Sequence, residues 1–128
     1  MESLMLAESS SQNNPPRYLR QEEFDLLCAM LKDDDLVASL STDPRVKDLH
    51  DGGMGSIKFV LEDSRGPRQA RCYAEADYMD SDGTPVNISV NIDQFGKLFE
   101  LDIWKVDFGR LKTYPTGWTI RNIRRADG

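Results

Sequence analysis

Four carboxylates occur in two short stretches where they could share one surface. Glu75 and Asp77 are separated by one alanine, and Glu100 and Asp102 by one leucine. Side chains two residues apart point to the same side of a β-strand, so each pair should lie on one sheet face. Such a surface can attract a basic protein, and carboxylate oxygens can also hold a hard divalent cation. The spacing does not resemble a calcium-binding loop, which favours the protein partner.

Aromatic and amide side chains extend the same stretches. Tyr73 precedes Glu75 by two residues, Trp104 follows Asp102 by two, and Asn87 belongs to the alternating run between them. Aromatic residues contribute much of the binding energy of protein interfaces. The sequence therefore predicts one binding surface that consists of Tyr73, Glu75, Asp77, Asn87, Glu100, Asp102 and Trp104. A solvated sheet face, partly neutralised by Lys58 and Arg71, would carry the same residues, and this alternative stays open.

No arrangement of residues in the sequence indicates catalysis. The single histidine, His50, stands next to Asp51, and adjacent residues do not converge as a catalytic triad requires. The run from Asp51 to Gly55 lacks the spacing of a phosphate-binding loop and precedes a strand pattern, so it is more typical of a tight turn or bulge. Zinc-ligand spacing, a nucleophile elbow and a dinucleotide fingerprint are absent. We therefore predict no catalytic residue, no metal ligand and no cofactor.

The elements that would hold the carboxylates follow from the spacing of apolar residues. A helix is predicted from Gln21, because four side chains fall at positions i, i+3, i+4 and i+7 of one stripe: Phe24, Leu27, Cys28 and Leu31. From residue 57 onward the period changes to two, which is typical of strands. The predicted strands are 57–61, 69–79, 85–92 and 97–108, with a short run at 118–120 as a fifth.

The turns between these strands predict which side chains meet. Ser81-Asp82-Gly83 suits a three-residue hairpin loop that ends in glycine, and it pairs Ala74 with Val90. Asp93-Gln94-Phe95-Gly96 reads as a four-residue turn, which pairs Val90 with Phe99. Both registers bring apolar side chains to one face, which the helix should cover. The predicted core is Val86, Ile88, Val90, Phe99, Leu101 and Ile103, together with Phe24, Leu27 and Leu31.

The same registers predict three rows on the opposite face. Asp77 aligns with Asn87 and Asp102, Glu75 with Ser89 and Glu100, and Tyr73 with Asn91 and Leu98. The predicted fold class is therefore α+β, with an N-terminal helix packed on one face of a four- to five-stranded antiparallel meander sheet.

Composition restricts the class of protein. The 128 residues carry a net charge of −6, which argues against a general nucleic-acid binder. Residues 1–16 are predicted as a disordered arm, 17–120 as a single α+β domain and 121–128 as a basic C-terminal tail. Cys28 and Cys72 have apolar neighbours and are predicted to be reduced and buried. The N-terminus lacks a signal-peptide pattern and no segment has the length of a membrane span, which predicts a cytoplasmic protein.

Three segments of the sequence are distinctive: DGGMGS at 51–56, Ala74-Glu75-Ala76, and LFELDIWKVDFG at 98–109. Through them the chain resembles, over roughly Arg17 to Pro115, a small bacterial family of unknown function. The resemblance implies no catalytic residues, because no activity belongs to the family. It implies a compact bacterial accessory domain. Small acidic proteins of this kind are often immunity proteins paired with basic toxins, which is an analogy of class.

The main functional prediction is a non-enzymatic protein-binding module, immunity- or antitoxin-like, whose acidic sheet face docks a basic partner. Neither nucleic acid nor a membrane is an expected partner. The alternative is a divalent-metal-binding or hydrolytic domain that uses the same carboxylates. Unpaired strand edges are predicted at 57–61 and 118–120. We expect a monomer or a weak dimer, and a dimer would form through one of these edges.

Overall fold

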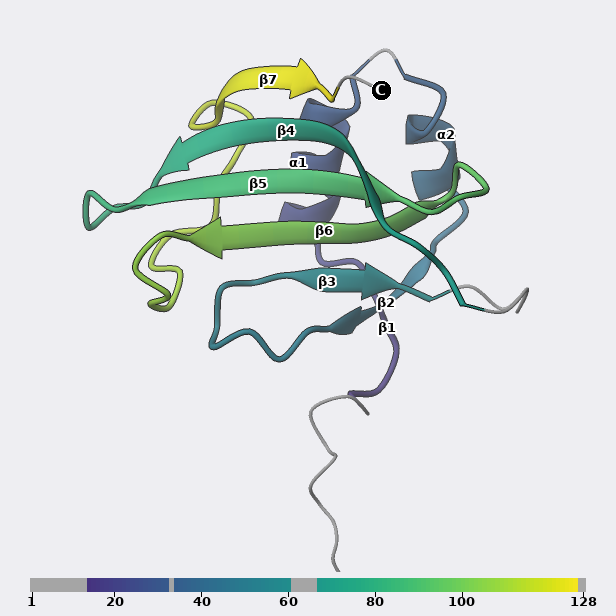
Figure 1. Ribbon diagram of the computed structural model, residues 1–128, viewed down its shortest axis with the longest axis horizontal. Helices are drawn as coiled ribbons and strands as arrows, with labels where there is room; N and C mark the ends of the chain where they lie inside the picture. Colours follow the sequence, from purple (N-terminus) through teal and green to yellow (C-terminus); the bar gives the residue numbers. More distant parts are fainter. Residues whose placement is uncertain (1–13, 33, 61–66, 127–128) are drawn as a thin grey trace, which may run out of the picture.

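The structure, a computed structural model, describes residues 14–32, 34–60 and 67–126. The strands of these residues form one antiparallel sheet, and Figure 1 shows α1 behind its central strands. The strands follow the order β1-β2-β3-β6-β5-β4-β7 across the sheet. The elements are β1 (Arg17–Tyr18), α1 (Gln21–Met30), α2 (Val37–Leu40), β2 (Arg45–Asp48), β3 (Ile57–Phe59), β4 (Arg71–Met79), β5 (Pro85–Ile92), β6 (Leu98–Lys105) and β7 (Arg121–Arg125).

The sheet is larger than the sequence predicted. The described residues form seven strands with two short helices, so the fold is mostly β and a four- to five-stranded sheet understates it. β1 and β2 are two and four residues long, which is too short for an alternating pattern to show. The meander holds for β4, β5 and β6, but β3 pairs with β6 and lies inside the sheet rather than at its edge. Leu61, which ended the predicted first strand, lies outside the described residues.

α1 covers the apolar face of the sheet. Leu27 and Leu31 are fully buried, as predicted, whereas Phe24 and Cys28 are only partly buried against the core. The buried stripe of the helix is rotated toward Leu26 and Met30. No helix among the described residues is long and apolar enough to span a membrane.

The hairpin between β4 and β5 has the predicted loop. The N–H of Asp80 donates to the carbonyl of Thr84 over 3.0 Å, and Gly83 has a φ of 83°, which glycine adopts without strain. The predicted core pairs of this hairpin are confirmed: Ala74 with Val90, Ala76 with Ile88, and Tyr78 with Val86.

The register between β5 and β6 differs from the prediction by two residues. Val90 pairs with Leu101 rather than Phe99, because the turn is one residue shorter than expected and a bulge follows between Asn91 and Ile92. Leu98 thereby joins the core cluster. Phe99 is buried elsewhere, with the guanidinium carbon of Arg68 4.2 Å from its ring centre. The other predicted core residues of β5 and β6 are confirmed as buried: Val86, Ile88, Val90, Leu101 and Ile103.

A second bulge changes the direction of side chains near the start of β4. The register of β4 with β5 shifts between Cys72 and Ala74, so Cys72 pairs with Asn91 rather than with Ile92. Tyr73 packs against the core and its hydroxyl donates to Asp34, beyond the end of α1. The predictions that placed Tyr73 on the polar face and Cys72 in the core were therefore wrong.

The long connection from β6 to β7 is fixed by a buried ion pair. The ammonium of Lys105 lies 2.9 Å from a carboxylate oxygen of Asp80 and 2.6 Å from one of Asp82. The Asp80 carboxylate also accepts the backbone N–H groups of Lys112 and Thr113, over 2.8 and 2.9 Å. These contacts hold the connection against the end of the core.

β7 lies later in the sequence than the predicted fifth strand. Arg121–Arg125 pair with the outer edge of β4, so these residues of the predicted tail form a strand and 118–120 do not. β7 was missed because all five of its residues are exposed and lack an apolar pattern. Residues 127–128 of the tail and 1–13 of the predicted arm lie outside the described residues.

Candidate functional site

The predicted polar residues gather on the sheet face opposite α1, which we call the open face. Its central rows are Glu75, Ser89 and Asp102, and next to them Asp77, Asn87 and Trp104. Asp102 therefore aligns with Glu75 rather than with Asp77 as predicted, because the β5–β6 register is shifted. Apart from Tyr73, the residues predicted for this face lie on it. The cross-strand pairs predicted between β5 and β6 differ from those in the structure.

Side chains of β7 bind two of the predicted carboxylates, Glu75 and Asp77. Arg124 lies 2.7 Å from Glu75 and 3.4 Å from Asp77, and the Asn122 amide donates to Asp77 over 3.0 Å. The amide of Asn122 and the guanidinium of Arg124 lower the pKa of Asp77. One positive charge therefore partly neutralises two negative charges in this half of the open face.

The other two carboxylates have weaker partners. The amide of Asn91 donates to Glu100 over 3.3 Å and to Asp102 over 3.1 Å. Glu100 also lies opposite Lys58 of β3. Asp102 has no ion-pair partner among the described residues, and partial burial together with the charge of Glu100 raises its pKa. Asp102 is therefore a carboxylate without a matching cation.

Asp102 lies where two hollows of the surface meet. The larger, a cleft of about 830 Å³, lies over β2, β3 and the loop after β2, and includes His50, Asp51 and Lys58. The smaller, of about 340 Å³, lies toward Trp104, and both hollows are lined by Ser56 and Asp102. A ligand that entered from either side would reach this carboxylate.

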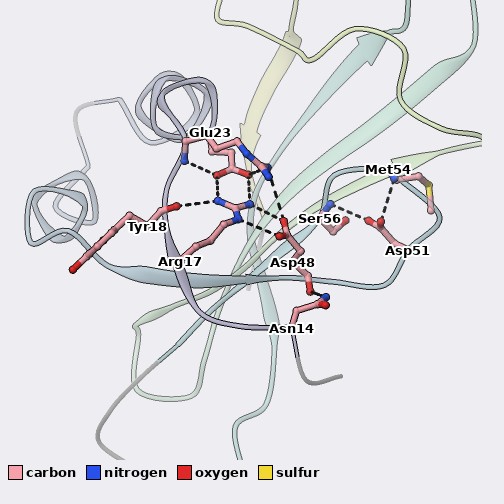
Figure 2. A network of polar contacts seen from close by, with 9 residues as sticks. Asn14, Arg17, Tyr18, Glu23, Asp48, Asp51, Met54 and Ser56 are labelled. Carbon is pink, nitrogen blue, oxygen red and sulfur yellow. Dashed lines mark hydrogen bonds and ion pairs between the residues drawn. The ribbon is translucent and has the colours of Figure 1, made fainter. Parts of the chain in front are cut away.

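The glycine-rich loop shapes the floor of the cleft. The Asp51 carboxylate accepts the backbone N–H of Met54 over 3.1 Å and that of Ser56 over 2.9 Å (Figure 2). The Ser56 hydroxyl bonds to both backbone groups of Ile103, so it serves the sheet and is not a free nucleophile. His50 is exposed in the same loop. The prediction of a turn rather than a phosphate-binding loop is consistent with this geometry.

A polar network at the end of the cleft had no signal in the sequence. Figure 2 shows the guanidinium of Arg17 between Glu23 and Asp48, with bonds of 2.7–3.1 Å to both carboxylates. Glu23 is buried and also accepts the backbone N–H of Arg20 over 2.8 Å, which closes the first turn of α1. The bonds from Arg17 lower the pKa of Asp48. This network joins β1, α1 and β2 and fixes one wall of the cleft.

An exposed aromatic pair borders the open face. The rings of Trp104 and Phe108 lie 5.9 Å apart in an edge-to-face arrangement. Their side chains are 45% and 69% exposed, which is unusual for aromatic rings of this size. Trp104 was predicted for this surface and Phe108 was not.

Because of the bulge at Tyr73, the side chain of Cys72 lies on the open face, where Tyr73 was predicted. Cys72 is partly buried, and its thiol lies 3.5 Å from the Glu75 carboxylate, to which it donates. Burial and this bond raise the pKa of the Cys72 thiol. Both cysteines are free, as predicted, and neither is fully buried. In the parts of the chain that the structure describes, no three His, Cys, Asp or Glu side chains are grouped to hold a metal ion.

Comparison with known proteins identifies a family of unknown function. Residues 16–115 match a domain of unknown function, DUF6984. No curated protein matches the chain, and no solved structure matches it either. The matched residues include β1 to β6 and both helices and end before β7. Because this match covers most of the 128 residues, the chain belongs to the DUF6984 family of domains of unknown function.

Proposed function

We propose that the chain is a non-enzymatic protein-binding module whose open face docks a basic segment of a partner, with Asp102 and Glu100 at its centre. The observation that carries the proposal is Asp102, a partly buried carboxylate at the meeting point of two hollows. It has no ion-pair partner in the described chain. A lysine or arginine from a partner would supply the cation and would favour the charged form of the carboxylate.

The arrangement of charge on the open face favours Asp102 and Glu100 over the other pair. Arg124 already binds Glu75 and Asp77, whereas the amide of Asn91 is the main polar partner of Asp102. Charged residues at an interface steer association and select the partner more than they add affinity. The free half of the face is therefore the better docking centre.

Trp104 and Phe108 would supply the apolar part of the interface. Large aromatic side chains beside a charged group are typical of the residues that dominate binding energy. Trp104 also lines the smaller hollow with Asp102, so a bound basic side chain could lie along its ring. This combination suits a protein segment better than a small anion.

The class of partner follows from the charge of the chain. A net charge of −6 favours a basic protein and opposes binding to nucleic acid. An immunity- or antitoxin-like role in the bacterial cytoplasm fits this chemistry, because masking a basic toxin requires an acidic docking surface. A toxin-like reading frame next to the gene would support this role.

The experiment compares partner recovery from the native cell by three proteins with matched charge changes. The test variant is Glu100→Lys with Asp102→Lys, and the control variant is Glu22→Lys with Asp25→Lys on the exposed side of α1. We expect wild type and control to recover the same basic protein, and the test variant to recover at least tenfold less. Equal recovery by all three folded proteins would contradict the proposal. Asp102→Asn, a milder change, should give an intermediate loss.

The metal-binding or hydrolytic alternative has one observation in its favour. The raised pKa of Asp102 beside a cleft of about 830 Å³ is a feature that acid catalysts share. Calorimetric titration with magnesium, calcium and manganese tests the metal part of this alternative. Heat of binding at millimolar metal that Asp102→Asn abolishes would favour it, and the absence of heat would speak against it.

A further inference from the structure

β7 is attached to the edge of β4 mainly through polar groups. All five of its residues are exposed, and Ile123, its apolar side chain, is 45% exposed. Arg124 and Asn122 reach the carboxylates of Glu75 and Asp77 on the open face. Little apolar surface is therefore buried when β7 pairs with β4, and burial of such surface is the main force that holds strands in place.

The backbone pairing of β7 is also irregular. Its register with β4 shifts between Glu75 and Asp77, and Asn122 has a φ of 56°, in the left-handed region. The other neighbour of β4 is β5, with which it pairs along almost its whole length. Of the two edges of β4, the one toward β7 is thus the weaker.

Two consecutive arginines of β7 reach opposite sides of the sheet. Arg124 binds the carboxylates of Glu75 and Asp77 on the open face. Adjacent side chains of a strand point to opposite faces, so Arg125 points to the other side of the sheet. Arg125 turns toward α1, where it donates to the carbonyl of Met30 over 3.1 Å and lies 3.4 Å from Asp34. Its guanidinium carbon is 5.3 Å from the ring centre of Tyr73. The edge of β4 therefore has acceptors for a pair of arginines.

β7 also lies outside the region that matches the family. The matched residues, 16–115, contain β4 with its acidic side chains but not β7. Unpaired sheet edges are the usual place where a partner adds a strand, so the outer edge of β4 would offer such a site when β7 leaves it.

We infer that the outer edge of β4, with Glu75, Asp77 and Asp34, is a binding site for an extended segment of a partner that carries two adjacent arginines. β7 is the resident occupant of this site, and the partner segment displaces it. The inference rests on the proposed function for the basic character of the partner. It concerns the β4 edge of the open face, whereas Glu100 and Asp102 lie on β6, two strands away.

The test measures binding of a fluorescent peptide with the sequence of residues 119–126 to the full chain. In the variant Ile123→Pro the proline removes one backbone N–H and restricts the conformation of Asn122 before it, which should weaken the pairing of β7 with β4. We expect this variant to bind the peptide at least tenfold more tightly than wild type does. A peptide with glutamine at the positions of Arg124 and Arg125 should bind at least tenfold more weakly. Equal affinity of both proteins, or of both peptides, would overturn the inference.

A measurement on wild type keeps the test decisive if Ile123→Pro does not fold. Hydrogen exchange of the backbone amides should be at least a hundredfold faster in β7 than in β5, because β7 opens alone. Equal protection of the two strands would show that β7 leaves only on global unfolding, which would contradict displacement.

Two further controls separate the possible causes of failure. The variant Glu22→Lys with Asp25→Lys, which makes the same charge change on the exposed side of α1, should bind the peptide as the protein without these two changes does. The open-face test changes Glu100 and Asp102 and measures partner recovery, whereas this test changes β7 and measures peptide binding, so each can fail separately. A wild-type dimer that Ile123→Pro abolishes would identify the strand of a second copy as the occupant, and would overturn the assignment to a different partner.

Discussion

Asp102 is a residue whose position opposes stability at neutral pH. Burial and the charge of Glu100 raise its pKa in the folded protein above the value of about 3.9 expected in the unfolded chain. The folded state therefore holds a proton that the unfolded state releases, so stability falls as the pH rises through this range. A functional carboxylate commonly carries such a cost.

We expect Asp102→Asn to unfold at a higher urea concentration than wild type at pH 7. Asparagine cannot ionise and can still accept the bond from Asn91. The difference should shrink as the pH falls toward and below about 4, because the aspartate of the unfolded wild type then becomes protonated as well. Urea titrations at pH 7 and pH 3.5 check this, and a variant less stable than wild type at pH 7 would contradict it.

Asp80 has the opposite effect on stability. Burial alone would raise its pKa, but backbone N–H groups, with that of Lys112 foremost, and the Lys105 ammonium outweigh burial and hold the pKa at about 2. The charged form is thus favoured by folding. Stability from Asp80 is complete above the unfolded pKa and is lost as the pH falls from about 4 to about 2.

Asp80→Asn should therefore destabilise the protein by about 2 kcal/mol at pH 7, on the order of the pKa difference converted to free energy. The gap between wild type and variant should narrow steadily below pH 4. Urea unfolding over a series of pH values measures the gap. A gap that is independent of pH would show that the hydrogen bonds, and not the charge, hold the connection after β6.

Side-chain contacts between residues far apart in the chain could not be predicted from the sequence. The carboxylates of the open face were found because each pair lies within one strand. The network of Arg17, Glu23 and Asp48 joins three elements, and no local spacing relates its members. The occupation of Glu75 by Arg124, 49 residues away, was hidden for the same reason.

The three central strands, β4, β5 and β6, carry the core, and their faces can be tested with two alanine substitutions. Leu101 is fully buried and aligned with Val90, whereas Ser89 is partly exposed on the open face. Leu101→Ala should lower the free energy of unfolding by about 2–5 kcal/mol. Ser89→Ala should change it by less than about 0.5 kcal/mol. Urea unfolding of both variants measures this, and the reverse order would mean that the strand faces are inverted.

Turn chemistry predicted one hairpin correctly and failed at the next for an identifiable reason. Ser81-Asp82-Gly83 fixes the β4–β5 register by itself, since its glycine has the required positive φ. The turn after β5 uses the same three-residue form, with Gly96 at a φ of 78°. The register that this turn would set is shifted by one further residue at the bulge at Phe99. There the ring of Phe99 packs under Arg68. Bulges depend on such tertiary contacts and have no reliable local pattern.

The molecule as a whole has short or charged sheet edges. One edge is β1, two residues long, and the other is β7, with arginines at 121, 124 and 125. Such edges resist pairing with another copy. The predicted edges at 57–61 and 118–120 were wrong, but the same conclusion follows from the actual ones.

We therefore expect a monomer or a weak dimer in solution. Sedimentation velocity at several protein concentrations, at low and at physiological salt, measures the state. If a weak dimer forms, it should dissociate on dilution, because neither edge offers a long apolar strand. A stable tetramer would contradict this expectation.

The position of β7 in the sequence affects how the protein forms during translation. β4 is complete by residue 79, whereas the strand that covers its outer edge begins at residue 121. At a synthesis rate of about 5–20 residues per second, the nascent chain exposes that edge for several seconds. An arginine-bearing segment present near the ribosome in this interval could pair with β4 before β7 is made. Complex formation with such a segment would then be faster with the nascent chain than with the finished protein.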